Sequence, residues 1–301
     1  MTPASKAPAS EADAVPATLR GPAWMVLAAF SYAVTGVLVR HLADDFSVFE
    51  VAFFRCLIAV FMIAPLIVRS PVASFRTIQL PMHGLRVVLT YAGIMCWFYG
   101  VSVIPLADYY ALQFTLPLFT IAGAVLFLGQ RADARTWLAV AVGLLGALVI
   151  LRPGVIAPGL GALAAVGAAV LFAGVNTCVK VLSRKETTNV IMLYANALVI
   201  PLSLAPALYD WHTPGWADWP WLIGVGVFGT LAQYAITRAI TVADARIVQP
   251  FDFTRLPFAA ALGWLFFGEV SDLWTWVGAV IIFGAGTYAL ARERAGAKQR
   301  R

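Results

Sequence analysis

Charged residues are scarce in the long apolar runs of this sequence, and the few that occur there could bind a charged ligand. Asp252 and Arg255 lie three residues apart, which places both on one face of a helix and within reach of each other. Arg55 lies near the middle of another run. An arginine at such a depth could bind a carboxylate or phosphate, and a buried aspartate could carry a proton. A structural ion pair between Asp252 and Arg255 is the alternative, and it would oppose the proton role.

Uncharged polar and aromatic residues in the same runs could donate hydrogen bonds to a substrate and stack on its planar groups. Hydrogen bonding between helices is the alternative role, because Asn and Gln also hold membrane helices together. Gln113 and Gln249 each follow an Ala-Asp pair at the same spacing, which ranks Gln113 higher. We predict a substrate-binding set made of Arg55, Trp97, Tyr99, Tyr110, Gln113, Asn176, Asn196, Gln233, Tyr234, Asp252 and Arg255.

Signals for catalysis, metal binding or cofactor binding are absent from the sequence. It has no G-x-S-x-G, H-E-x-x-H or G-x-x-x-x-G-K-S/T motif. The three histidines lie at the edges of apolar runs or between them, and the three cysteines lie inside runs, as small core residues do. We therefore predict no catalytic residue, no metal and no cofactor. The protein is not expected to be an enzyme or to use ATP directly.

The elements that must position these residues are membrane helices. The chain has 301 residues, of which 61% are hydrophobic and 12% charged, whereas soluble domains carry about 25% charged residues. The basic residues behind the net charge of +6 are spread singly at the ends of apolar runs, which argues against nucleic-acid binding. A spanning helix needs about 17–25 apolar residues. Ten runs reach or approach that length: 22–39, 47–68, 84–103, 106–128, 136–151, 159–179, 189–208, 219–237, 246–267 and 273–291.

The distribution of basic residues predicts how these runs are oriented. With the N-terminus inside, 17 of the 21 Lys and Arg fall in cytoplasmic segments, Arg86 among them, and only two fall outside. Such a bias is typical of the cytoplasmic side of a membrane protein. We expect a multi-pass protein of the bacterial inner membrane with both termini in the cytoplasm. In this interpretation residues 1–21 form a disordered tail and residues 292–301 a basic tail.

An internal repeat divides the runs into two equal sets. Residues 126–137 recur 139 positions later as residues 265–276, with the shared pattern L-F-x-G-Q/E-x-x-D-x-x-T-W. Each half, 22–152 and 153–291, holds five runs, and this odd number inverts the second half relative to the first. Inverted repeats are typical of secondary transporters. Glycines in the fifth and tenth runs predict closely packed helix faces: Gly143, Gly146, Gly278 and Gly284.

Two stretches of sequence, one in each half, resemble the EamA type of the drug/metabolite transporter superfamily. The first comprises residues 99–108, 116–119 and 126–129, and the second comprises residues 251–258 and 266–269. The resemblance covers residues 22–292 and implies ten helices, two EamA domains and a central cavity between them. Members of the superfamily carry amino acids, vitamins, nucleoside-type cofactors, metallophores and drugs, mostly outward. Where the first domain usually has Gly-Glu, this chain has Gly129-Gln130.

Together, the residues and the resemblance predict an all-α membrane protein with ten transmembrane helices in an inverted 5+5 repeat of two EamA domains. The expected function is a secondary transporter that exports a small polar organic metabolite across the plasma membrane by alternating access. Two alternatives stay open: an uptake permease for a vitamin- or nucleoside-type cofactor, and an intramembrane enzyme that modifies lipids. The expected partners are the metabolite and the lipid bilayer, with no nucleic acid, and a homodimer is left open.

Reporter fusions test the predicted topology. A reporter that is active only in the cytoplasm should work when fused after Arg301, because the basic residues hold both termini inside. The same reporter inserted beside Trp216 should be inactive, because that loop is predicted to lie outside. Activity of the Trp216 fusion would contradict the ten-span topology.

Overall fold

The computed structural model describes residues 17–68, 77, 79–128, 134–151, 159–182, 185–186, 188–242 and 251–298, and within them it is helical, with no strand. Helices suit an apolar chain in lipid, because each backbone group finds its hydrogen-bond partner within its own segment. The longer helices are α1 (Ala17–Leu42), α2 (Val48–Val68), α3 (Leu80–Val103), α6 (Ala134–Leu151), α7 (Leu160–Leu182), α10 (Trp219–Val242) and α13 (Leu273–Lys298). The shorter ones are α4 (Leu106–Gln113), α5 (Leu116–Leu128), α8 (Thr188–Ala197), α9 (Val199–Ala207), η3 (Leu208–Asp210) and α12 (Arg255–Phe267).

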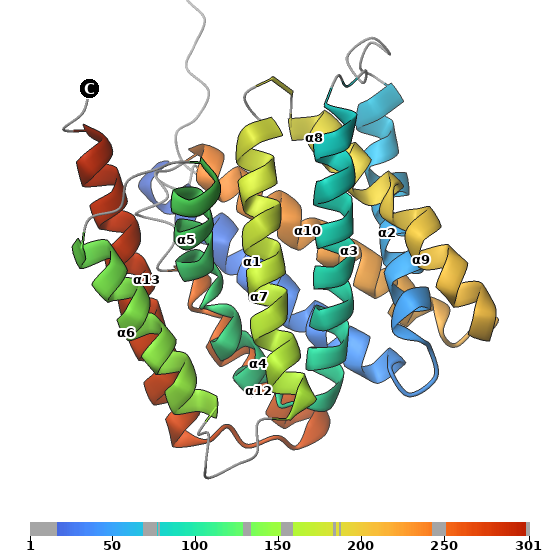
Figure 1. The fold of residues 1–301 in the computed structure, drawn as a ribbon. Helices are drawn as coiled ribbons and strands as arrows, with labels where there is room; N and C mark the ends of the chain where they lie inside the picture. The colour runs from blue at the N-terminus through green and yellow to red at the C-terminus, as the bar shows by residue number, and fades with distance from the viewer. Residues whose placement is uncertain are drawn as a thin grey trace, which may run out of the picture.

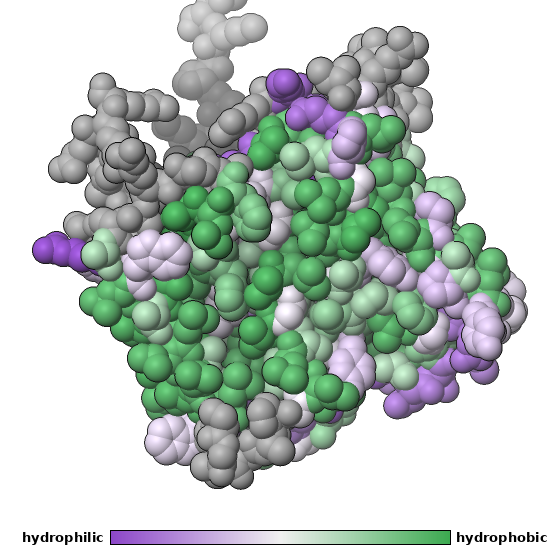
Figure 2. Space-filling model, in the orientation of Figure 1, coloured by the Kyte–Doolittle hydropathy of each residue, from purple (hydrophilic) through white to green (hydrophobic). Residues whose placement is uncertain are grey.

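Length, composition and surface mark the bundle as a membrane protein. Four spans of the described chain are long and apolar enough to cross a bilayer: Arg20–Leu42, Leu80–Val103, Leu106–Phe127 and Leu160–Leu182. Figure 2 shows hydrophobic residues over most of the middle of the visible face, with hydrophilic residues gathered near its upper and lower right edges. Exposed apolar surface of this extent marks contact with lipid. The protein is therefore a multi-pass membrane protein, and each of the ten predicted runs contains one or two of the described helices.

The ends of the chain are more helical than predicted. Helix α1 begins at Ala17, inside the predicted tail, and α13 continues to Lys298, beyond the predicted end of the last run at residue 291. Ala, Arg and Glu dominate this last stretch, and all three favour helix even outside a membrane. The rest of the predicted N-terminal tail lies outside the described residues. So do residues 129–133 of the first motif copy and residues 243–250, which include Gln249.

Two of the spans are broken at equivalent points of the repeat. The first break, at residues 114–115, separates α4 from α5, and the second, at residues 253–254, precedes α12. The offset between the breaks is 139 positions, as in the sequence repeat. Pro117 and Pro257 follow the breaks closely. A proline lacks an N–H and its ring clashes with the carbonyl four residues earlier, which interrupts a helix at that place.

If each helix is replaced by its counterpart in the other half, the same pairs of helices remain in contact. Helix α1 packs on α10 as α7 packs on α3, and α1 packs on α12 as α7 packs on α5. The pairs α6–α13 and α2–α9 exchange into themselves. In Figure 1, α5 ends and α6 begins near the C-terminal end of the bundle, whereas α12 ends and α13 begins at the opposite end. This is the arrangement predicted for an inverted repeat.

Glycines bring α6 and α13 into close contact. A Cβ atom added to Gly278 would lie 2.4 Å from Cγ1 of Ile150 and 2.6 Å from the carbonyl oxygen of Gly146. The predicted packing role is confirmed for these two glycines. For Gly284 it is wrong, because no atom of the described residues lies within 4 Å of an added Cβ atom there. The sequence does not show which side of α13 faces α6, since both sides are apolar.

Replacing Gly278 should weaken the bundle. We expect Gly278→Ala to lower the midpoint of thermal unfolding in detergent, because overpacking of this kind costs about 1–3 kcal/mol. Gly284→Ala, on the same helix, is the matched control. Its midpoint should stay unchanged or rise slightly, because alanine favours helix over glycine. Equal midpoints for the two variants would contradict the α6–α13 contact.

Candidate functional site

A cavity of about 550 Å³ lies inside the bundle, with walls from both halves. Its volume falls in the range of about 300–1,000 Å³ that is typical of sites for small organic molecules. The lining residues lie in the middle of the bundle and toward the end at which α1 begins and α13 ends. On α7, for example, they span residues 172–179, close to the end of that helix at Leu182. Ala17 and Lys298, the first and last described residues, both lie at that end (Figure 1), which is the predicted cytoplasmic end.

Eight of the eleven predicted binding residues line this cavity, and three do not. Tyr99 and Tyr234 lie on the outer surface, with 39% and 45% of each residue exposed. Tyr110 is fully buried and donates its hydroxyl hydrogen to the carbonyl oxygen of Tyr32 at 2.6 Å, which joins α4 to α1. The binding role of the set stays a prediction. The residues that line the cavity are Arg55, Trp97, Gln113, Asn176, Asn196, Gln233, Asp252 and Arg255.

The predicted pairing of Asp252 with Arg255 is confirmed. Nη2 of Arg255 donates to Oδ1 of Asp252 at 2.5 Å. The guanidinium also lies over the ring of Tyr32, 4.6 Å from its centroid, and 5.8 Å from the centroid of Tyr110. A cation in this position gains from the electrons of both rings. The pair therefore belongs both to the cavity wall and to the packing of α12 against α1.

Arg55 lines the cavity and packs against α10 at Gly229. A Cβ atom on Gly229 would lie 3.1 Å from Nε of Arg55 and 3.8 Å from its Cδ, so the glycine leaves room for this side chain. Nη1 lies 4.0 Å from the sulfur of Cys56, a weak contact. None of the ion pairs among the described residues includes Arg55.

Two other predicted residues have clear structural contacts. The side-chain amide of Gln113 donates to the hydroxyl of Tyr109 at 2.7 Å and to the carbonyl oxygen of Ala165 at 2.9 Å, which holds α4 against α7. Trp97 packs edge-on against Tyr109, with the ring centroids 6.2 Å apart. Gln113 thus fills the helix-holding role that was its alternative, although it also borders the cavity.

Sequence reasoning missed Arg86 and Thr90. We counted Arg86 with the cytoplasmic segments, yet it lies in α3, is only 8% exposed and lines the cavity. Thr90 follows it by one helical turn and also lines the cavity. A basic residue near the end of an apolar run looks the same in sequence whether it faces the headgroups or the interior. The neighbouring His83, also inside α3, was the one hint of an inward polar face.

Polar contacts between the halves hold the end of the bundle opposite the termini, which we call the sealed end. Arg40 of α1 forms an ion pair with Glu269, and Nη1 of Arg40 also donates to the carbonyl oxygen of Ile104 at 3.3 Å. The backbone N–H of Leu106 donates to the other carboxylate oxygen of Glu269 at 2.9 Å. Glu269 belongs to the second copy of the repeated motif. It thus ties that copy to α1 and α4 of the first half.

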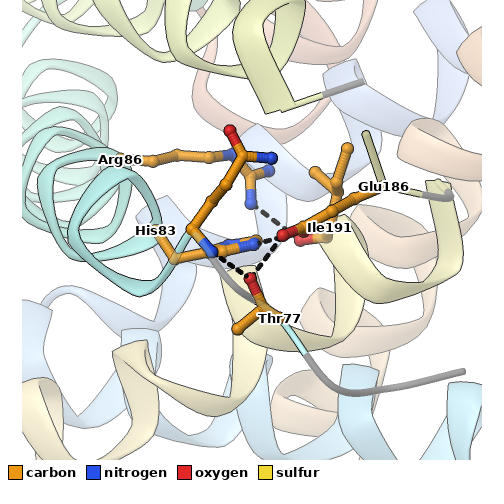
Figure 3. Close-up of polar contacts among 6 residues, drawn as sticks. Thr77, His83, Arg86, Glu186 and Ile191 are labelled. Carbon is orange, nitrogen blue, oxygen red and sulfur yellow. Dashed lines mark hydrogen bonds and ion pairs between the residues drawn. The ribbon is translucent and has the colours of Figure 1, made fainter. Parts of the chain in front are cut away.

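A second polar cluster joins the halves at the predicted cytoplasmic end (Figure 3). His83 of α3 lies 2.6 Å from one carboxylate oxygen of Glu186, which lies between α7 and α8, and the hydroxyl of Thr77 donates to the other oxygen. Burial alone would raise the pKa of Glu186, but the hydrogen bonds with Thr77 and His83 outweigh it and hold the pKa below its usual value. This carboxylate is therefore charged and engaged on both oxygens.

Comparison with solved structures agrees with this fold. A crystal structure superposes with a TM-score of 0.63, covering 93% of this chain and 98% of that chain. The two sequences are 16% identical, so this likeness supports the fold alone.

Comparison of sequences identifies the family. A riboflavin transporter of Vibrio cholerae is 36% identical and covers 88% of this chain and 90% of its own length. The pseudopaline exporter CntI of Pseudomonas aeruginosa is 32% identical, covering 90% and 95%. An S-adenosylmethionine uptake transporter of Rickettsia prowazekii is 27% identical, covering 94% and 96%. Residues 19–152 and 159–290 each match the EamA-like transporter family. The chain therefore belongs to the EamA-like transporter family, and it is a transporter built from two copies of that domain.

Proposed function

We propose that the protein is a secondary transporter of the bacterial inner membrane that carries a small polar organic metabolite by alternating access. The observation that carries this proposal is a cavity between two repeated halves whose lining extends toward the predicted cytoplasmic end, away from the Arg40–Glu269 ion pair at the sealed end. Inverted copies can exchange their arrangements, so a second state of similar energy can close the other end instead. With both termini in the cytoplasm, the described state is the one whose cavity faces inward.

Riboflavin, or a vitamin of similar chemistry, is the substrate that we propose first, with import as the direction. Support comes from the riboflavin transporter of Vibrio cholerae, whose similarity extends over nearly the whole chain. The cavity wall offers the rings of Trp97 and Phe114 for stacking on a planar heterocycle, and the amides of Asn176 and Gln233 for hydrogen bonds to its edge.

Export of a metallophore-like molecule is the second candidate. It is favoured by the pseudopaline exporter, which is similar over nearly its whole length. A carrier that simply follows the gradient of its substrate can run in either direction, so the same cavity serves both candidates.

Transport in proteoliposomes tests the first candidate. Purified protein should accumulate riboflavin in a saturable way, followed by flavin fluorescence. Trp97→Leu should raise the KM by about two- to tenfold, because a stacked aromatic pair contributes about 0.5–1.5 kcal/mol. Trp264→Leu is the matched control, since Trp264 of α12 is 65% exposed and lies outside the cavity wall. Absence of saturable uptake by the wild-type protein would remove riboflavin as the substrate.

Loss of the Glu269 carboxylate should loosen the sealed end. Glu269→Gln removes the ion pair with Arg40, and a shift of about 1.4 kcal/mol would raise the outward-open population about tenfold. A cysteine introduced by Gln233→Cys, in a variant without the three native cysteines, reports this change. It should react faster with an impermeant thiol reagent added outside the cell. Asp210→Asn, an exposed carboxylate of η3, is the control. Equal rates in both variants would show that the ion pair does not hold this end closed.

A further inference from the structure

The charges that face the cavity do not balance. Its described wall holds three arginines, Arg55, Arg86 and Arg255, and one acidic residue, Asp252, which gives a formal charge of +2. Asp252 is already bound by Arg255. Neither Arg55 nor Arg86 takes part in any ion pair among the described residues. Charged groups inside an apolar bundle are costly and mark functional places.

Arg86 has donors that nothing in the described chain satisfies. Its Nη1 donates to the carbonyl oxygen of Ile191 in α8 at 2.7 Å. Its Nε has no hydrogen-bond partner among the described residues, and neither does the hydroxyl of Thr90, although both atoms are buried. Both residues line the cavity, as does Arg255, whose Nε also lacks a partner among the described residues, so three residues of the same wall carry an unsatisfied donor. A buried donor without a partner destabilises the fold unless a ligand or water completes it.

Two structural explanations for Arg86 fail. Arginines near helix ends often extend to the lipid headgroups, but this residue is buried and turns toward α8. Figure 3 shows Glu186 nearby, held by Thr77 and His83, but none of the ion pairs among the described residues joins it to Arg86. The hydrogen bond to Ile191 satisfies Nη1 of Arg86 and leaves its Nε without a partner among the described residues.

We propose that Arg86 and Thr90 form a subsite for an anionic group of the transported molecule, either a phosphate or a carboxylate. A guanidinium presents parallel N–H groups that match the oxygens of both, and the Thr90 hydroxyl adds a further donor. Arg55, in the wall of the same cavity, supplies the second uncompensated positive charge. The subsite favours an organic anion, such as a ring compound that carries a phosphate, over an uncharged molecule such as riboflavin, which would leave it empty. This inference rests on the proposed transport through the cavity.

Anion binding to purified protein tests the subsite directly. The protein is placed in nanodiscs of phosphatidylcholine and titrated with inorganic phosphate, and in parallel with acetate, against chloride at equal ionic strength. The readout is the midpoint of thermal unfolding, which rises with the logarithm of ligand concentration above the Kd. We expect the wild-type protein to be stabilised by at least one of the two anions.

Three variants locate the binding. In Arg86→Gln the Kd for the anion should rise at least about tenfold, because charge-assisted hydrogen bonds are lost. Thr90→Val keeps the shape of the side chain and should raise the Kd about two- to fivefold by removing one donor. Arg238→Gln, which removes an exposed arginine of α10 outside the cavity wall, should leave the Kd unchanged.

Several outcomes would overturn the subsite. These are no stabilisation of the wild-type protein by either anion, or the same Kd in Thr90→Val and Arg238→Gln. The Thr90→Val comparison decides the question even if Arg86→Gln fails to fold. If nanodiscs of phosphatidylglycerol abolish anion binding, a lipid headgroup occupies the site and not the substrate. Failure of riboflavin transport is a separate result, because the anion titration requires no transport.

Discussion

The paired breaks at residues 114–115 and 253–254 determine where polar chemistry can occur in this apolar bundle. A broken helix leaves backbone groups that lipid cannot satisfy, so a break has to lie where protein or water reaches it. Phe114 and Phe253, equivalent residues of the two copies, stack at this place with their ring centroids 5.3 Å apart and their planes 25° apart. Asp252 and Arg255 flank the second break and line the cavity. The cavity therefore lies where two inverted copies break and meet.

The polar groups around the cavity are of two kinds: some form hydrogen bonds that join neighbouring helices, and others have no partner among the described residues. Gln113 and Tyr110 fix α4 between α7 and α1, and this arrangement keeps Arg255 over the ring of Tyr32. Nε of Arg86, Nε of Arg255 and the hydroxyl of Thr90 differ, because they have no acceptor among the described residues. Charged and polar groups without a partner are costly inside an apolar bundle, so such an excess of donors indicates a binding site.

Much of the fold could be predicted from the sequence, because length and apolarity alone mark a membrane span. The direction in which a residue faces could not, because the lipid-facing and protein-facing sides of these helices are both apolar. For this reason Tyr99 and Tyr234 were expected in the cavity and lie on the outer surface, and Gly284 was expected at a contact that it does not make. The positions of the two helix breaks could not be predicted from proline either. Pro117 and Pro257 follow the breaks, but Pro22 lies within the unbroken helix α1, so a proline does not by itself indicate a break.

The unbalanced arginines of the cavity also connect this protein to the membrane voltage. Moving one elementary charge through 100 mV changes its energy by about 2.3 kcal/mol. In alternating access the aqueous boundary moves past a nearly fixed site, so Arg55 and Arg86 change their place in the electric field while scarcely moving. A potential that is negative inside favours the empty cavity facing the cytoplasm, and a bound anion cancels that preference by neutralising the charge. The field therefore acts on the unloaded carrier far more than on the loaded one, and the voltage would govern the return step of each cycle.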